Sequence, residues 1–290
     1  MCEGKRDSGD VIVTLDNGSI VQHGPYNDRI YLMKAGEESF SELPSALIAM
    51  AKEKNYSKVF AKITGRNTAP FLDSGFVPEA AAPNLNNAGS CIYFMSYYLS
   101  EARREEKNPG EYEKIRELAV SKSNTGVTPL DDSRFVLRRC SENDASQMAD
   151  LYAEVFPTYP FPIFNPDFLI DTMKNNVEYL CIESLEEPGR IVALSSAEID
   201  YSSSCAEMSD CATLPGRRGN GFGVHLLTAL DSETRKKGIK TNYTIARSAN
   251  HGINIMFAKC GYVFGGRLKN NTNIAGRIES MNIWYKNVLC

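Results

Sequence analysis

Hydrophobic and polar residues follow two spacings along the second half of the chain. Met148, Leu151, Tyr152 and Val155 recur every three or four residues, which predicts an amphipathic helix. Shorter stretches of strand-like composition precede and follow it, separated by polar turns. The other predicted elements are helices at 167–173 and 224–237 and strands at 135–139, 178–184, 191–200, 206–214 and 240–246. With one more helix and two final strands, this order combines an antiparallel meander with one β-α-β crossover.

The first half shows a weaker version of the same order. A helix-like run at 43–54 and a strand-like run at 58–63 correspond to the runs at 224–237 and 240–246. In both halves an Asn then precedes a Phe, and a Gly and an aromatic residue follow that Phe four and five residues later. This shared order indicates an old duplication, and chance similarity between two α/β units is the alternative.

A change in composition separates the two halves. Between Ser100 and Ser133 the chain is first highly charged and then polar and rich in turn-forming residues. Such a stretch is typical of a surface helix followed by a linker. We therefore expect two domains, at 1–125 and 133–290.

Composition excludes several classes of function. The 290 residues are 42% hydrophobic and 23% charged, as is ordinary for a folded protein. A net charge of -4 gives no broad basic field, so nucleic acid is not an expected partner. The N-terminus is polar and no stretch reaches the ~18 apolar residues of a membrane span, so we expect a cytoplasmic protein without membrane contact. The eight cysteines show no CxxC pair and no metal-ligand spacing with histidine, which predicts reduced thiols and no metal site.

The strongest motif is the glycine-rich stretch LPGRRGNGFGVHLL at 214–227, which precedes a predicted helix. Bare backbone beside a helix N-terminus suits an anion, most often phosphate, because the first N–H groups of a helix are unpaired. A dinucleotide fingerprint does not fit, since Val224 stands where its third glycine is needed. A P-loop does not fit either, because no Gly-Lys-Ser/Thr precedes the helix.

This stretch instead resembles the R/Q-x-x-G-x-G/A loop of the GCN5-related N-acetyltransferases (GNAT), which binds the pyrophosphate of acetyl-CoA. The segment 250–262 is similar to a later N-x(6)-Y/F-x-K-x-G-F/Y segment of that family, and Thr213-Leu214-Pro215 stands where the fourth strand of the family ends. The resemblance covers 133–290. It implies an α/β (α+β) GNAT fold, with a mixed, mostly antiparallel sheet flanked by helices, and a degenerate GNAT-like first half that lacks the loop.

Nearly the whole chain resembles the β-lysine N-acetyltransferases, through NDRIYLMK, YTIARSANHGINIMFAKCGY and LKNNTNIAGRIESMNIWYK. That resemblance implies acetyl transfer from acetyl-CoA to the ε-amine of β-lysine, a small-molecule amine, which makes the compatible solute Nε-acetyl-β-lysine in a monomer or homodimer. Two alternatives remain open. The acceptor could be another diamine, amino acid or protein lysine, or the protein could sense acyl-CoA without turnover.

The family resemblance also implies the residues that contact the cofactor. A bulge in the fourth strand is expected to free a backbone N–H that polarises the thioester carbonyl. Phe257 stands where many relatives have a Tyr that protonates the leaving thiolate, so Tyr243, Tyr262, Tyr285 or water are the remaining candidates. The implied cofactor-binding residues are Cys211, Ala212, Thr213, Leu214, Arg218, Gly219, Asn220, Gly221, Phe222, Gly223, Asn250 and Phe257.

Two carboxylates are candidates for the catalytic base. An amine of pKa ~10.4 is protonated at neutral pH and must lose a proton before it attacks. Histone-type relatives use a Glu six residues before the last apolar position of the fourth strand, which corresponds to Glu207. Asp210 is the rival, and on a regular strand the two side chains face opposite sides unless a bulge intervenes. A surface salt bridge is the alternative role for each.

A pocket for β-lysine should hold acidic groups, amide dipoles and one cation, because this substrate carries two ammonium groups and a carboxylate. Candidates are Glu279, Asn271, Asn273, Arg247 and Tyr201, each with ordinary edge-strand polarity as the alternative. Tyr159 and Phe161 could form a wall and contact an ammonium through cation–π attraction, or simply pack a proline-rich loop. No residue of 1–125 indicates chemistry. We expect the first half to cover one side of the cleft or to take the place of a second subunit.

Overall fold

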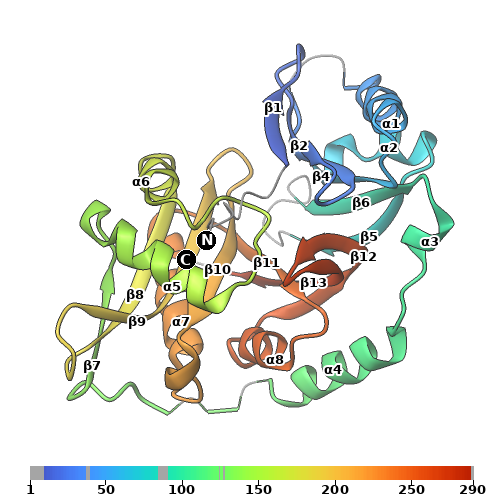
Figure 1. Cartoon of the computed structure of the whole chain (residues 1–290). Coiled ribbons are helices and arrows are strands. Elements are labelled where there is room, and N and C mark those ends of the chain that lie inside the picture. Colours follow the sequence, from blue (N-terminus) through green and yellow to red (C-terminus); the bar gives the residue numbers. More distant parts are fainter. Residues whose placement is uncertain (1–9, 37–39, 84–90, 124, 127, 289–290) are drawn as a thin grey trace, which may run out of the picture.

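The computed structural model describes residues 10–36, 40–83, 91–123, 125–126 and 128–288. Across these residues thirteen strands form one mixed sheet, in the order β1-β2-β3-β4-β6-β5-β12-β13-β11-β10-β9-β8-β7 (Figure 1). The first-half strands therefore occupy one end of the sheet, and the second-half strands occupy the other.

The first half contains six strands and four helices in its described residues. They are β1 (Val11–Thr14), β2 (Ile20–Gly24), β3 (Arg29–Lys34), α1 (Leu43–Glu53), β4 (Lys58–Thr64), α2 (Ala69–Asp73), β5 (Val77–Ala82), β6 (Ile92–Tyr98), α3 (Glu101–Arg104) and α4 (Pro109–Ser121).

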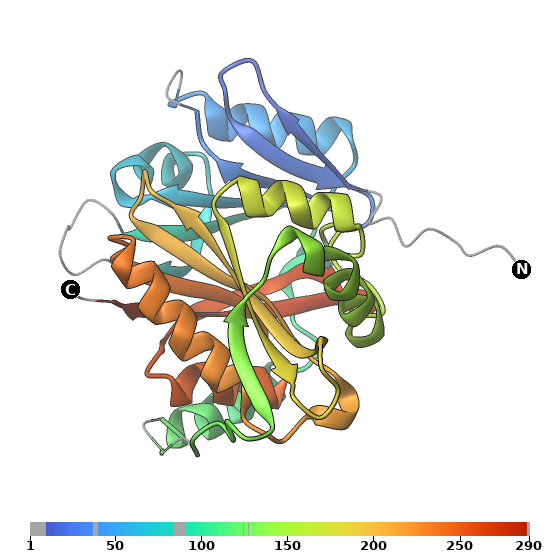
Figure 2. The ribbon, with the colours of Figure 1, turned by 90° about the vertical axis from the view of Figure 1, so that its left-hand side faces the viewer.

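The second half follows the order that its sequence pattern predicts. Its elements are β7 (Phe135–Arg139), α5 (Ala145–Val155), α6 (Pro166–Lys174), β8 (Val177–Ser184), β9 (Arg190–Asp200), β10 (Cys205–Thr213), α7 (Phe222–Lys236), β11 (Thr241–Arg247), α8 (His251–Lys259), β12 (Val263–Ile274) and β13 (Arg277–Asn287). Val224, Leu227 and Leu230 of α7 are buried, as their spacing predicts. Figure 2 shows α5 and α6 on one face of the second-half strands and α7 on the other, and the adjacent residues Glu178 and Tyr179 of β8 accordingly contact Lys237 at the end of α7 and Thr172 of α6.

The two halves repeat one topology. The series β2-β3-α1-β4-α2-β5-β6 matches β9-β10-α7-β11-α8-β12-β13. In each series the second strand pairs in parallel with the strand after the helix, as β3 does with β4 and β10 with β11. In each, the last strand also inserts between its two predecessors, as β6 does between β4 and β5 and β13 between β11 and β12.

The halves join where β5 lies beside β12. Gly266 pairs with Ala80 at this junction and has a φ of +138°, which side chains rarely adopt. A Cβ on Gly266 would lie 2.3 Å from the Glu79 carbonyl oxygen, and one on Gly265 would lie 2.3 Å from the Ala81 carbonyl oxygen. The two glycines therefore allow the close contact between the halves.

An apolar core continues across this junction. Besides a separate core in each half, one cluster combines Tyr31, Phe60 and Phe94 of the first half with residues of β10 to β13. The rings of Phe94 and Tyr243 meet edge to face with centroids 5.5 Å apart. Buried aromatic contacts of this kind fix the two halves against each other. Among the described residues, no helix is both long and apolar enough to cross a membrane.

Candidate active site

A cavity of about 170 Å³ lies between the two halves. Its first-half wall consists of side chains from β3 and β4, including Arg29, Tyr31, Phe60 and Lys62. Its second-half wall is formed by β9 to β12, the start of α8 and the loop 156–161 between α5 and α6. The sequence pattern identified no chemistry in the first half, yet the first half contributes two cations to this cavity.

A bulge in β10 brings both predicted carboxylates into the cavity. The ladder between β9 and β10 pairs Ser209 with Ser196 and resumes at Ala212, leaving Asp210 and Cys211 without cross-strand partners. Asp210 adopts a φ of +50°, the left-handed conformation that the extra residue requires. Glu207 and Asp210 therefore both line the cavity, although a regular strand would place them on opposite faces.

Beyond the cavity, β10 separates from β11. The two strands pair in parallel only from Cys205 to Glu207, whereas β10 continues to Thr213. Between β10 and β11 the backbone edge that follows Glu207 is thus open. An extended chain bearing amide groups could hydrogen-bond along such an edge.

A third carboxylate faces the first two. Glu198 of β9 stands directly opposite Glu207 in the ladder, and its side chain borders the cavity. Burial, together with the charges of Glu207 and Asp210, raises the pKa of Glu198 to about 8. Burial also raises the pKa of Glu207 and of Asp210. Three acidic groups at close quarters therefore form a site for a cation or for a shared proton.

Lys62 of β4 compensates part of this charge through a short relay. Its Nζ donates to Tyr243 Oη at 3.1 Å, and Tyr243 Oη donates to Glu207 Oε2 at 3.0 Å. Burial alone would lower the pKa of Lys62, but Tyr31, Glu207 and Glu198 raise it above its usual value. Lys62 therefore stays an ammonium and holds Glu207 in place through Tyr243.

Hydroxyl groups hold Asp210. Ser196 Oγ donates to Asp210 Oδ2 at 2.9 Å, and Ser209 Oγ donates to Oδ1 at 3.2 Å. Tyr159 of the proline-rich loop also hydrogen-bonds to this carboxylate, and burial raises the pKa of the Tyr159 hydroxyl well above 10. Asp210 is thus fixed beside the bulge.

The glycine-rich loop presents unpaired N–H groups at the start of α7. Gly219 and Gly221 have φ values of +89° and +73°, and a Cβ added to Gly219 would meet no atom within 4 Å. In the part of the chain that the structure describes, the N–H groups of residues 219–223 donate no hydrogen bond. Five free donors at the positive end of a fifteen-residue helix form a site for an anion.

Asn250 and Phe257 hold α8 and also border the cavity. Asn250 caps this helix, because its Oδ1 accepts from the Ile253 N–H at 3.1 Å. Phe257 is buried, with its ring edge to face against Tyr262 and the centroids 5.1 Å apart. Tyr262 donates to Asp231 at 2.6 Å, and neither Tyr262 nor Tyr285 lines the cavity.

The predicted acceptor residues divide into two groups. Tyr159, Phe161, Arg247 and Asn271 line the cavity, whereas Tyr201, Asn273 and Glu279 do not. Tyr201 lies on an exposed turn between β9 and β10, and the Asn273 amide donates to the Tyr26 carbonyl oxygen at 2.8 Å. Glu279 accepts both Nε and Nη2 of Arg247 at 2.8 Å and faces a separate pocket. The charge of Arg247 is therefore already neutralised.

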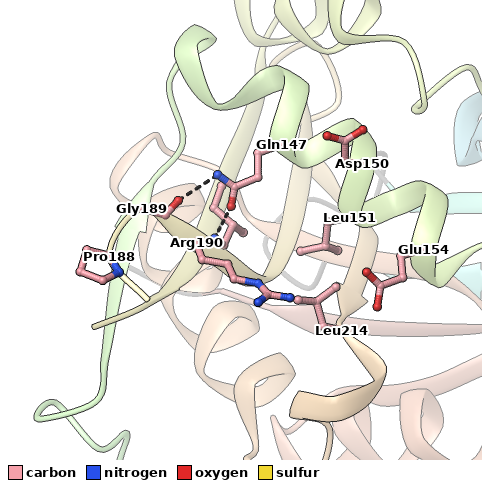
Figure 3. A pocket seen from close by; sticks show the side chains of 9 residues that line it. Gln147, Asp150, Leu151, Glu154, Pro188, Gly189, Arg190 and Leu214 are labelled. Carbon is pink, nitrogen blue, oxygen red and sulfur yellow. Dashed lines mark hydrogen bonds between the residues drawn. The ribbon is translucent and has the colours of Figure 1, made fainter. Parts of the chain in front are cut away.

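A shallower hollow of about 380 Å³ lies beside α5 (Figure 3). Gln147 crosses it and donates to the Gly189 carbonyl oxygen at 2.8 Å, which holds the turn between β8 and β9 against α5. Its carboxylates, Asp150 and Glu154, are exposed to solvent, whereas Asp210 of the cavity between the halves is 7% exposed. We therefore place the active site in that cavity and at the adjoining glycine-rich loop.

Comparison with known proteins agrees with this geometry. The sequence profile of the acetyltransferase (GNAT) family matches residues 145–262, which include β10, the glycine-rich loop and α8. A β-lysine N(6)-acetyltransferase of Methanococcus maripaludis is 39% identical over 272 residues, which is 93% of this chain and 96% of that protein. The chain belongs to the acetyltransferase (GNAT) family.

Further GNAT relatives also match both halves. The N-acetyltransferase YodP of Bacillus subtilis is 32% identical, over 92% of this chain and 95% of its own. A β-lysine N(6)-acetyltransferase of Methanosarcina mazei is 30% identical, over 84% of this chain and 96% of its own. Membership confirms the predicted GNAT fold and the prediction of an N-acetyltransferase enzyme, and acetyl-CoA is the acetyl donor of this family.

Proposed function

We propose that this GNAT enzyme transfers the acetyl group of acetyl-CoA to the ε-amine of β-lysine. The observation that carries the proposal is the match of two β-lysine N(6)-acetyltransferases over 93% and 84% of the chain. The cavity supports it independently, because three acidic side chains line it and could bind the ammonium groups of the acceptor. A cavity of only about 170 Å³ between the two halves also suits a free amino acid better than a lysine of a protein chain.

Acetyl-CoA would supply an activated thioester, and residues of the second half would hold it. The free N–H groups at 219–223 and the exposed Arg218 would bind its pyrophosphate. The open edge of β10 would pair with the amide groups of its pantetheine arm, placing the thioester beside Ala212. A backbone N–H of the bulge would then stabilise the negative charge that develops on the carbonyl oxygen.

The carboxylate cluster would bind the acceptor amine and remove its proton. Glu207 is the proposed base, because Tyr243 and Lys62 fix it and its raised pKa makes it a better proton acceptor. Asp210 and Glu198 would stabilise the ammonium before the proton leaves. As the amine nitrogen bonds to the carbonyl carbon, the carbon–sulfur bond breaks. A thiolate of pKa ~8.5 can leave without the Tyr that Phe257 replaces.

We also propose the two-domain division at 1–125 and 133–290, with the first half descended from a GNAT unit that carries no CoA loop. The repeated strand and helix order supports this division. In this arrangement the first half provides the wall that closes the acceptor cavity.

Measuring CoA release with different amines tests the proposed function. Purified protein receives acetyl-CoA together with β-lysine, α-lysine, ornithine, spermidine or a lysine peptide. We expect a kcat/KM for β-lysine at least tenfold above the others and a single mono-acetylated product by mass. A preference for another amine would replace the proposed acceptor, and CoA binding without any product would favour an acyl-CoA sensor.

A further inference from the structure

Arg29 of β3 presents an unused hydrogen-bonding edge to the cavity. Its Nη1 donates to the Asn271 carbonyl oxygen at 2.5 Å and to Thr272 Oγ1 at 3.1 Å. Its Nε is buried and without a partner, and Nη2 makes no hydrogen bond within the described residues. Nε and Nη2 form the side of a guanidinium that matches the two oxygens of a carboxylate.

This guanidinium also lacks a counter-ion in the part of the chain that the structure describes. Arg29 is 3% exposed, and no carboxylate lies within ion-pair distance of it. Asp10, the acidic residue that influences its charge most, accepts instead from Tyr26 and Asn27. Arg103 and the buried Lys58 add further positive charge nearby. An uncompensated buried cation of this kind is costly unless a ligand supplies the anion.

A second unpartnered group adjoins this edge. Asn271 is 1% exposed and lines the cavity, and its Oδ1 is buried without a hydrogen bond. An amide oxygen is an acceptor, so it suits an ammonium group rather than a carboxylate. The cavity is thus lined both by a paired donor on Arg29 and by a single acceptor on Asn271, the residue whose carbonyl oxygen Arg29 Nη1 contacts.

We propose that Arg29 and Asn271 bind the head group of a β-amino acid, with the substrate carboxylate on Arg29 Nε and Nη2 and its β-ammonium on Asn271 Oδ1. This inference rests on the proposed function and adds the residues that decide specificity. The acidic cluster of β9 and β10 lines the same cavity beside the bulge, where the ε-amine would react. Arg29 is not expected to take part in acetyl transfer itself.

A pair of matched substrates isolates the carboxylate. 1,4-Diaminopentane is β-lysine without its carboxylate and keeps both amines. We expect wild-type kcat/KM for β-lysine to exceed that for 1,4-diaminopentane about 100-fold, as two charge-assisted hydrogen bonds predict. Arg29→Gln should remove most of this preference: kcat/KM should fall about 100-fold for β-lysine but only several-fold for 1,4-diaminopentane, the smaller loss coming from the contact with the Asn271 carbonyl oxygen, with KM for acetyl-CoA unchanged. Lys34→Gln, which removes an exposed cation from the same strand, should leave kcat/KM unchanged for both substrates.

Binding in the presence of CoA, measured by calorimetry, separates this inference from the proposed function. If Arg29→Gln weakens the binding of β-lysine at least tenfold more than the binding of 1,4-diaminopentane, the result supports the head-group site even if another amine proves the better acceptor. Asn271→Leu should weaken the binding of both compounds equally, because both carry the second ammonium group. The inference would be overturned if Arg29→Gln lost affinity for both compounds equally, or if the wild-type protein bound both compounds equally well. Absence of β-lysine binding to the wild type would overturn both proposals.

Discussion

Charges of both signs line the cavity. Glu198, Glu207 and Asp210 are its acidic residues, and Arg29 and Lys62 are its basic ones. Lys62 lies within the acidic group and limits its self-repulsion. A substrate with ammonium groups and a carboxylate can be oriented by such a field before any specific contact forms.

Replacing Glu207 with Gln tests the proposed base. The amide keeps the shape of the side chain but cannot accept the proton, so kcat should fall about 100-fold, with little change in KM for acetyl-CoA. Steady-state rates at several pH values measure this effect. The control is Glu178→Gln, because Glu178 of β8 pairs with Arg139 and Lys237 and does not line the cavity. This variant should leave kcat unchanged. A loss smaller than threefold would transfer the role to Asp210 or to water.

Lys62→Met should move the pH dependence of the reaction. The reactive carboxylate must be ionised, so kcat/KM falls as the pH drops below its raised pKa. Lys62 lowers the pKa of Glu198, which is about 8, and that of Glu207. Without this ammonium both pKa values rise, and the acidic limb should shift upward by roughly one pH unit. Lys62→Arg keeps the charge and should leave the limb in place, and an unmoved limb in Lys62→Met would contradict the assignment.

Neither Glu198 nor Lys62 could be predicted as a site residue. Each lies in a strand with ordinary alternation, and nothing local distinguishes a carboxylate facing a cavity from one facing water. Glu198 gains its importance from its cross-strand partner Glu207, and Lys62 from contact with Tyr243, 181 positions away. One useful signal was available in the sequence, namely that Glu198 directly follows an uncharged run of apolar and small residues at 191–197.

At the level of elements, α7 is the part of the fold that the sequence predicts best. Its apolar spacing, its glycine-rich start and Gly238 after its last turn all act over a few residues. The bulge of β10 is different, since the family resemblance predicts it but no local pattern does. The first three strands went unpredicted because their short segments are stabilised by pairing with one another rather than by propensity.

Gly221→Glu should abolish acetyl-CoA binding. The new carboxylate would lie at the helix N-terminus where the pyrophosphate is proposed to bind, and its bulk would cover the free N–H groups. Calorimetric titration with acetyl-CoA measures the loss, which we expect to exceed 100-fold. Gly238→Glu is a matched control, since Gly238 has a similar φ of +80°, equally open surroundings and a place at the opposite end of α7. Retained affinity in a folded Gly221→Glu variant would refute this site.

At the level of the whole molecule, the first half shapes the acceptor pocket through a bulge in β12. Between Leu268 and Thr272 three residues of β12 oppose one residue of β13. Their carbonyl oxygens each accept from a buried cation of the first half. Lys58 donates to Lys269 at 2.8 Å, Arg103 to Asn270 at 2.6 Å and Arg29 to Asn271 at 2.5 Å. This arrangement holds Asn271 at the cavity.

Arg103→Gln should therefore affect both stability and acceptor binding. Its guanidinium also donates to the Asn27 carbonyl oxygen at 2.8 Å, so its loss leaves buried acceptors unpaired. We expect the free energy of unfolding to fall by about 2–4 kcal/mol and KM for the amine to rise several-fold, with acetyl-CoA binding preserved. Urea unfolding and steady-state kinetics measure the two effects. Arg104→Gln changes the exposed neighbour on α3 and should alter neither the free energy of unfolding nor KM for the amine. Equal effects of the two variants would show that other contacts hold the bulge in β12.

The repeated topology places two unlike walls around one cavity within a single polypeptide. In a symmetric dimer, any change to the wall that one subunit offers its neighbour also alters that subunit's own catalytic face, because both carry the same sequence. Here the strand with Arg29 and the strand with Glu207, β3 and β10, hold equivalent positions in the two halves and can vary independently. A new amine could thus be accommodated by altering residues around Arg29 alone, while the acetyl-transfer machinery stays intact.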